Sequence, residues 1–170
     1  MTMTILAYQD FLQVAARKLQ DPALINRRSA LLIVNFERLA ELDGILGFAV
    51  VDKILTQVSN QLKAALNTED LVGTTGRYQV SCLLSDLLTD AHAMLAAHKI
   101  LRVLALPFVL DRRNIILAPR IGVALKNNAS ATLEQLMSNA SSAVRQARLA
   151  QESIKLFAAE TEDPLHFQID

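Results

Sequence analysis

The side chains that most often carry chemistry in enzymes are sparse in this sequence. His92, His98 and His166 do not stand at the spacing of paired metal ligands, and the single cysteine, Cys82, can build neither a zinc cluster nor an internal disulfide. Cys82 lies in an apolar run, where we expect it to pack rather than react. No phosphate-binding loop, dinucleotide-binding glycine motif or serine-nucleophile elbow occurs in the strand, turn and helix context that each requires. No sequence motif therefore supports the interpretation of this chain as a conventional enzyme.

The pattern of apolar residues predicts the elements that must position any site. Apolar residues at helical spacing predict helices over 11–19, 47–66, 89–104 and a last stretch from Thr132, where Gln135 three residues later completes a capping-box pattern. Short apolar runs predict strands over 30–34, 71–74, 78–84, 108–110, 115–125 and 154–157. Gly76 and the turn-like stretch 111–114 indicate two β-hairpins. The order helix, strand, helix, hairpin, helix, hairpin, helix, strand predicts an α+β domain with a largely antiparallel sheet.

Composition limits the class of protein. The chain has 170 residues, 52% of them hydrophobic, which fits one folded domain. Lys plus Arg and Asp plus Glu are both 17, so no overall field attracts nucleic acid, and we expect no nucleic-acid partner. We expect neither a signal peptide nor a membrane span, and a cytoplasmic location. We divide the chain into an N-terminal helix at 1–25, a main domain at 26–160 and a polar tail at 161–170.

Several segments, taken in order, carry a resemblance to one family. The run 31–39 leads from an apolar strand into a turn, as in Asp-x-Asp-x-Phe, and 47–52 is similar to Gly-His-x-x-Gly-Asp. Residues Gly76, Arg77, Tyr78, Gln79 and Val80 stand where Gly-Gly-Asp-Glu-Phe would be. Later landmarks follow at 107–108, 121–124 and 140–148. By this joint order and spacing the chain resembles the GGDEF family of diguanylate cyclases over about three quarters of its length.

The resemblance implies a GGDEF or nucleotide-cyclase-like fold, with helices flanking a mostly antiparallel sheet and an extra N-terminal helix. The family reaction joins two GTP molecules, with Mg²⁺ held by carboxylates. The matching positions here are Asn35, Tyr78 and Gln79, and Glu37 is a displaced carboxylate near the degenerate metal position. Arg77 places a guanidinium where the family has its second glycine. The resemblance therefore implies a degenerate domain without a metal, other cofactor or cyclase activity.

Nucleotide binding without catalysis stays open at this stage. By the resemblance, Asp43 and Asp52 stand where the family reads guanine, and Arg148 stands where a lysine contacts phosphate. The family's following basic residue corresponds to Glu152, which would repel phosphate. The alternative is that both aspartates cap or solvate helix ends and that Arg148 is an ordinary surface residue.

A second family site would lie just before the signature turn. The family's inhibitory product site uses Arg-x-x-Asp, and this chain has Asn-Thr-Glu-Asp at 67–70, so Asp70 remains and the arginine is lost. The loss predicts weaker binding of cyclic di-GMP, because arginine supplies the bidentate fork to phosphate or guanine. The alternative is a solvated loop between a helix and a strand.

Three hypotheses about function follow. The first is a non-catalytic regulatory module of cyclic di-GMP signalling that acts through a protein partner or a homodimer. The second is a sensor that binds GTP through Asp43 and Asp52 without cyclase activity. The third is residual catalysis with Glu37 as an improvised metal ligand. The apolar face of the N-terminal helix must be covered by its own domain or by a second copy, which makes a dimer contact one expectation.

Overall fold

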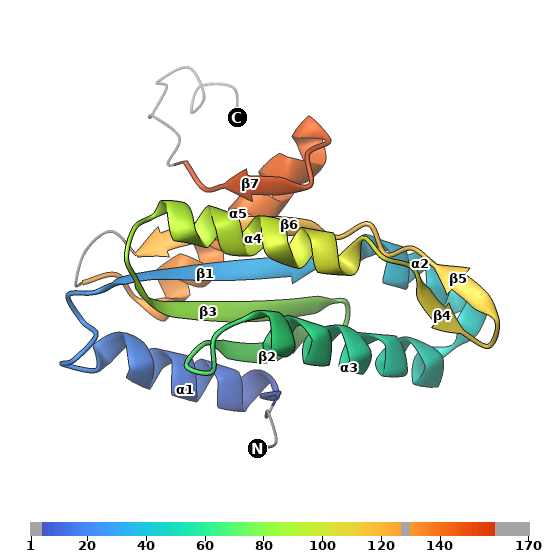
Figure 1. Cartoon of the computed structure of the whole chain (residues 1–170), viewed down its shortest axis with the longest axis horizontal. Helices are drawn as coiled ribbons and strands as arrows, with labels where there is room; N and C mark the ends of the chain where they lie inside the picture. Colours follow the sequence, from blue (N-terminus) through green and yellow to red (C-terminus); the bar gives the residue numbers. More distant parts are fainter. Residues whose placement is uncertain (1–4, 127–129, 159–170) are drawn as a thin grey trace, which may run out of the picture.

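A five-stranded sheet in the order β2-β3-β1-β6-β7 forms the centre of the molecule (Figure 1). The computed structural model describes residues 5–126 and 130–158. The predicted polar tail at 161–170 lies outside the described residues. The elements along the chain are α1 (Tyr8–Gln20), β1 (Arg28–Asn35), α2 (Glu37–Leu46), α3 (Phe48–Ala65), β2 (Leu71–Gly76), β3 (Gln79–Leu87), α4 (Ala91–Leu104), β4 (Phe108–Leu110), β5 (Arg113–Ile115), β6 (Arg120–Lys126), α5 (Leu133–Ala150) and β7 (Ile154–Leu156).

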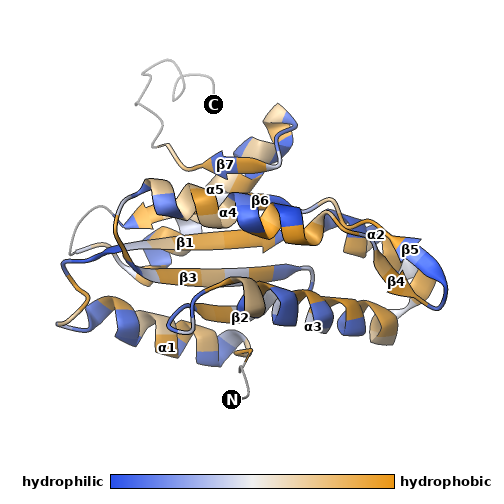
Figure 2. Ribbon diagram, in the orientation of Figure 1, coloured by the Kyte–Doolittle hydropathy of each residue, from blue (hydrophilic) through white to orange (hydrophobic). Residues whose placement is uncertain are grey.

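The central strand β1 divides the core in two. It pairs antiparallel with β3 and with β6, β2 pairs antiparallel with β3, and only β7 is parallel to its neighbour β6. Because side chains alternate along a strand, Ala30, Leu32 and Val34 face one core while Leu31 and Ile33 face the other. Figure 2 shows β1 hydrophobic along most of its length, as a strand buried on both faces should be.

Helices cover both faces of the sheet. Helices α3 and α4 supply the first core, and α1 and α5 supply the second. In Figure 1, α4 lies in front of the sheet and α5 behind it. Gly122 of β6 allows α5 to approach closely, since a Cβ there would lie 2.2 Å from the Ala140 carbonyl oxygen. This arrangement is the α+β fold that the sequence predicts, and the predicted capping box of α5 is present at Thr132 and Gln135.

The apolar face of α1 is covered by its own domain. Phe11 and Ala15 are fully buried and Leu19 is nearly so. Leu6, just before the helix, forms a parallel bridge to Gly73 of β2. A Cβ at Gly73 would lie 2.6 Å from the Phe11 ring, so the glycine makes room for the aromatic side chain. For these three residues, the apolar face of the helix is therefore covered by its own domain rather than by a second copy of the chain.

The chain between β1 and β2 forms two helices where the sequence predicts one. Helix α2 ends at Leu46 and α3 begins at Phe48. The break is at Gly47, whose φ of 87° lies in a region that glycine adopts without the steric cost of a Cβ. The predicted helix over 47–66 agrees with α3. The sequence analysis did not predict the turn at Gly47 that separates α3 from α2.

The single strand predicted over 115–125 is wrong. The stretch divides into β5, which ends at Ile115, and β6, which begins at Arg120. Ala118 has a φ of 45°, and Pro119 has no N–H to donate to a strand ladder, so the chain turns between them. As a result, β4 and β5 form a separate two-stranded sheet, and β6 joins the central one.

Two further expectations concern Cys82 and the membrane. Cys82 is fully buried and unpaired, and desolvation by burial raises the pKa of its thiol to about 12, which confirms that it packs. Within residues 5–126 and 130–158, no helix combines the length and apolar character that crossing a bilayer requires.

Candidate functional site

The carboxyl end of β1 brings together the residues that the sequence assigns to a lost metal site. Asn35 is the last residue of β1 and lies in register with Gln79 of β3 on one side and Arg120 of β6 on the other. Glu37 follows at the start of α2. Because three antiparallel strands begin or end here, the sheet gathers side chains that are far apart in the sequence.

Glu37 is paired with two arginines. Its Oε1 accepts from Nε of Arg148 on α5 and lies 4.0 Å from Nε of Arg120. Arg120 also donates from Nη1 to the Glu152 carbonyl oxygen at 2.8 Å, which ties it to the end of α5. The structure therefore places Arg148 against Glu37. Arg120 was missed from the sequence, because no local pattern links it to either residue.

The tip of the β2–β3 hairpin forms a second cluster. Nε of Arg77 donates to Oδ2 of Asp43 at 2.8 Å, and the same oxygen accepts from Nη2 of Arg77 and, at 2.6 Å, from the Tyr78 hydroxyl. The Arg77 guanidinium also lies over the Phe48 ring, 4.5 Å from its centroid. The Tyr78 hydroxyl and the Arg77 guanidinium hold the pKa of Asp43 below its ordinary value of 3.8. One carboxylate oxygen of Asp43, Oδ2, thus accepts all three hydrogen bonds from the signature turn.

The other turn residues support the hairpin. Gln79 donates from Nε2 to the Thr75 hydroxyl at 3.0 Å, and the Thr75 and Ser81 hydroxyls lie 2.6 Å apart. Val80 is fully buried in the core. Gly76 does not have the positive φ of a left-handed turn. A Cβ at Gly76 would instead lie 3.2 Å from the Gln79 Cβ, so close packing accounts for a small residue there.

A pocket of about 290 Å³ opens beside this cluster. It lies between α3 and the end of β2 and is lined by Phe48, Val51, Asp52, Leu55, Thr74, Gly76 and Arg77. Asp52 is exposed, and no side chain among the described residues pairs with its carboxylate. The structure therefore brings Asp52 and Arg77 to one pocket and places Asp43 behind the guanidinium.

Asp70 is part of the framework of the molecule. It is only 4% exposed, and its carboxylate accepts from the backbone N–H of Asn67 at 3.0 Å and of Ser85 at 3.3 Å. The Lys63 ammonium donates to the Asp70 carbonyl oxygen. Desolvation by burial raises the pKa of the Asp70 carboxyl. The loop is therefore anchored to β3 by a buried carboxylate, which the sequence pattern did not reveal.

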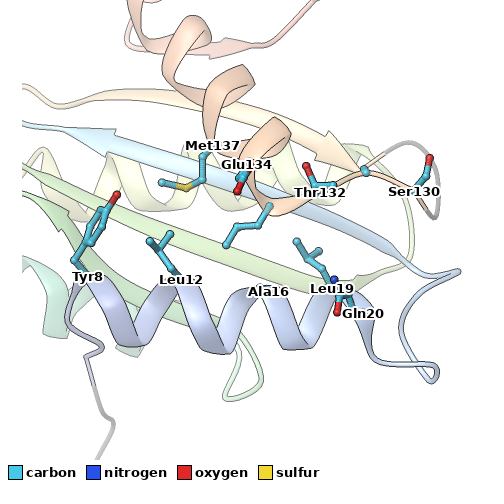
Figure 3. Close-up of a pocket in the computed structure, with 11 residues that line it drawn as sticks. Tyr8, Leu12, Ala16, Leu19, Gln20, Ser130, Thr132, Glu134 and Met137 are labelled. Atoms are coloured by element: carbon cyan, nitrogen blue, oxygen red, sulfur yellow. The ribbon is translucent and has the colours of Figure 1, made fainter.

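A groove of about 870 Å³ runs between α1 and the start of α5 (Figure 3). Tyr8, Leu12 and Leu19 reach from α1 toward Met137 of α5 and its N-cap residue Thr132. Leu12 and Met137 are partly buried, and Tyr8 is 47% exposed. Sequence reasoning missed this groove, because it depends on how two helices pack rather than on the pattern within either one.

The family is decided by a comparison that covers most of the chain, up to the residue before β7. Residues 2–153 match the family model described as the diguanylate cyclase GGDEF domain. The chain belongs to the GGDEF domain family. Cyclic di-GMP phosphodiesterase NbdA of Pseudomonas aeruginosa is 25% identical over 138 residues, which are 81% of this chain and 18% of that protein. Diguanylate cyclase TpbB of the same species is 29% identical over 138 residues, or 78% of this chain and 32% of TpbB. The GGDEF chain thus spans about a fifth to a third of these relatives.

Solved structures of GGDEF domains share the fold. The isolated GGDEF domain of TpbB from P. aeruginosa has a TM-score of 0.83 at 25% identity, covering 98% of this chain and 96% of that one. An EAL/GGDEF protein from M. capsulatus has a TM-score of 0.72 at 27% identity, covering 78% and 86%. Diguanylate cyclase SiaD, solved with its activator SiaC, has a TM-score of 0.77 at 15% identity, covering 89% and 58%, a likeness of fold alone. The predicted GGDEF resemblance and fold class are confirmed.

Proposed function

We propose that this chain is a catalytically inactive GGDEF domain that serves as a regulatory or interaction module in cyclic di-GMP signalling. The observation that carries the proposal is the chemistry at the end of β1. Asn35 lies between Gln79 and Arg120, and the nearby carboxylate of Glu37 is held by Arg148 and Arg120. These positive side chains lie near the position that, by the resemblance, would hold the divalent cation of the family reaction, and this supports the proposal.

Mg²⁺ requires hard oxygen ligands, chiefly carboxylates, and keeps near-octahedral geometry. The Arg120 guanidinium, 4.0 Å from the Glu37 carboxylate, competes with a metal cation for that carboxylate. Its positive charge also repels the metal cation. Among the described residues, no three His, Cys, Asp or Glu side chains are grouped to hold a metal ion. Without the cation, the charge that develops on the transferred phosphoryl group loses its main stabilisation.

The direct test incubates the purified chain with GTP and Mg²⁺ and measures cyclic di-GMP by chromatography and mass spectrometry. We expect no product, while full-length diguanylate cyclase TpbB serves as the reference under the same conditions. Product formed by the pure chain overturns the proposal. Product that disappears in Glu37→Gln would support residual catalysis with Glu37 as an improvised ligand.

A regulatory domain without catalysis must act through contact with another protein or a second copy of itself. SiaD, part of which shares this fold, was solved in complex with its activator SiaC, which supports the idea that a protein with a GGDEF domain can work with a protein partner. Sedimentation equilibrium of the full chain separates the two routes. A dimer mass favours self-association, and a monomer mass favours a different protein.

The second candidate function is a GTP sensor without cyclase activity. The specific observation that favours it is Asp52, whose unpaired carboxylate lines the pocket beside Phe48. A carboxylate can accept hydrogen bonds from the N–H groups of guanine. Calorimetric titration with GTP, with and without Mg²⁺, tests this candidate, and an unchanged affinity in Asp52→Ala would exclude the site. Binding of cyclic di-GMP alone would redirect attention to the loop around Asp70.

A further inference from the structure

The Arg77 side chain is placed as a ligand would be placed in the pocket beside α3. Its guanidinium offers two N–H groups, on Nε and Nη2, to one carboxylate oxygen of Asp43. Its flat face lies over the Phe48 ring, 4.5 Å from the centroid, and it lines the same pocket as Asp52. Two kinds of contact therefore converge on one side chain, paired hydrogen bonds and stacking, and the carboxylate of Asp52 lines the same pocket.

These contacts match the chemistry of a guanine base. The edge of guanine that carries N1–H and the N2 amino group is itself a guanidine unit, with two adjacent N–H donors in one plane. A carboxylate that accepts from the guanidinium could accept from that edge, and an aromatic ring that packs on the guanidinium could stack on the base. Adenine lacks this pair of donors, because its N1 is an acceptor.

We propose that Arg77 is an internal occupant of the base pocket, and that a guanine base binds only when it displaces the Arg77 guanidinium from Asp43 and Phe48. The inference rests on the second candidate function for the location of the pocket and adds its regulation. The closed form has Arg77 on Asp43. In the open form the arginine moves into solvent, and Asp43, Phe48 and Asp52 are available to the base.

The position of Arg77 makes this exchange feasible. It is in the two-residue tip of the hairpin, and its side chain is 47% exposed, so it can leave without disturbing the core. The Tyr78 hydroxyl, which donates to the same oxygen of Asp43, would remain in place. The backbone of Tyr78 is held independently, because its carbonyl oxygen accepts from the Phe36 N–H at 2.8 Å. The opening is therefore a side-chain movement on a fixed hairpin.

The closed form reduces the apparent affinity for guanine in proportion to the population of the open form. If the open form is a tenth of the population or less, removal of the arginine tightens binding by at least about tenfold. The effect should be selective for guanine, since only a base with paired donors uses the Asp43 oxygen that Arg77 releases.

The test is calorimetric titration of the full chain and of Arg77→Ala with GTP and with ATP. We expect Arg77→Ala to bind GTP at least about tenfold more tightly than the wild type, with no matching gain for ATP. Arg102→Ala, which removes an exposed arginine of α4, is the matched control and should bind as the wild type does. The double variant Arg77→Ala, Asp52→Ala should lose the gain.

Equal and measurable affinities of wild type and Arg77→Ala for GTP overturn the inference alone, whereas no binding of GTP by either protein overturns the GTP-sensor candidate together with the inference. Thermal unfolding of each variant by circular dichroism establishes that the compared proteins are folded, and Arg77→Lys, whose ammonium can still pair with Asp43, should gain less affinity for GTP than Arg77→Ala. Failure of the inference alone is therefore distinguishable from failure of the candidate function on which it rests.

Discussion

At the scale of single residues, two glycines differ in the space that surrounds them, a difference that the sequence alone does not reveal. Gly122 lies in β6 beneath α5, where a Cβ would meet the Ala140 carbonyl oxygen at 2.2 Å and the Val144 nitrogen at 2.8 Å. These are backbone atoms of a helix, which cannot move separately. Gly44 lies in α2, with nothing within 4 Å of the same added atom. The pair offers a matched comparison of steric fit.

We predict that Gly122→Ala destabilises the domain by about 3 kcal/mol or more, because α5 must move off the sheet. Gly44→Ala should stabilise by up to about 1 kcal/mol, since alanine favours a helix interior over glycine. Urea unfolding followed by circular dichroism measures both. A Gly122→Ala protein as stable as the wild type would contradict the close packing of α5 on β6.

The Asp43 cluster makes a prediction about pH. The Tyr78 hydroxyl and Arg77 lower the pKa of Asp43 in the folded state below 3.8, so the ionised carboxylate stabilises the fold above that pH. The contribution is lost as pH falls through the folded pKa. The gap in unfolding free energy between wild type and Asp43→Asn should therefore be constant near neutral pH and close below about pH 3.8. A gap unchanged to pH 2 would contradict the prediction.

Asp70 titrates in the opposite sense. Its pKa is raised mainly by burial, so its contribution to stability is present at pH values below 3.8 and declines as pH rises through the folded pKa. Both proteins in the Asp43 comparison contain Asp70. Its effect cancels in the difference, whereas the stability curve of the wild type alone would mix the two groups.

At the scale of elements, the start of α5 has a clear local signal in the sequence, the capping box of Thr132 and Gln135. The Thr132 hydroxyl accepts from the Gln135 backbone N–H, and the Gln135 side chain accepts from the Thr132 N–H, both at 3.2 Å. We predict that Thr132→Ala lowers the free energy of unfolding by about 1 kcal/mol, because the Gln135 N–H at the helix end loses its side-chain acceptor. Ser138→Ala, an exposed change within the same helix, should cost nothing measurable in the same urea titration.

The elements also show where sequence reasoning is sufficient. The α5 cap, the α3 stripe and the hairpin were predictable because their signals are local, lying within a few residues. The break at Gly47 and the division of 116–119 also have local signals, a glycine and Pro119, but their effect depends on backbone angles at Gly47 and Ala118. Pattern alone did not identify these positions as turns.

The candidate site was only partly predictable for a different reason. The sequence identified Asn35, Glu37, Asp43 and Asp52 through a resemblance, and the sheet then determined their neighbours. Arg148 reaches Glu37 because α5 packs on β6 and β1, and Arg77 reaches Asp43 because the hairpin tip turns toward α2. Such pairs depend on tertiary packing, which no pattern within one segment encodes.

At the scale of the whole molecule, two cores lie back to back across one sheet. Every residue from Ala30 to Val34 is fully buried, and these residues contribute alternately to the two cores. Neither layer can be lost without exposing the central strand to water on one face. We therefore expect the sheet and its helices to unfold together as one cooperative unit.

Cys82 lies at the centre of that unit, in register with Leu32 of β1 and Val72 of β2. A thiol with a pKa of about 12 and no solvent exposure is inert, because the thiolate is the reactive form. As the chain has one cysteine, an added thiol reagent can label it only in molecules whose sheet has opened. The rate at which Cys82 is labelled in the native protein therefore reports how often the sheet opens. With reclosing fast relative to labelling, Gly122→Ala should accelerate labelling by the factor that its lost stability implies, and Gly44→Ala should not.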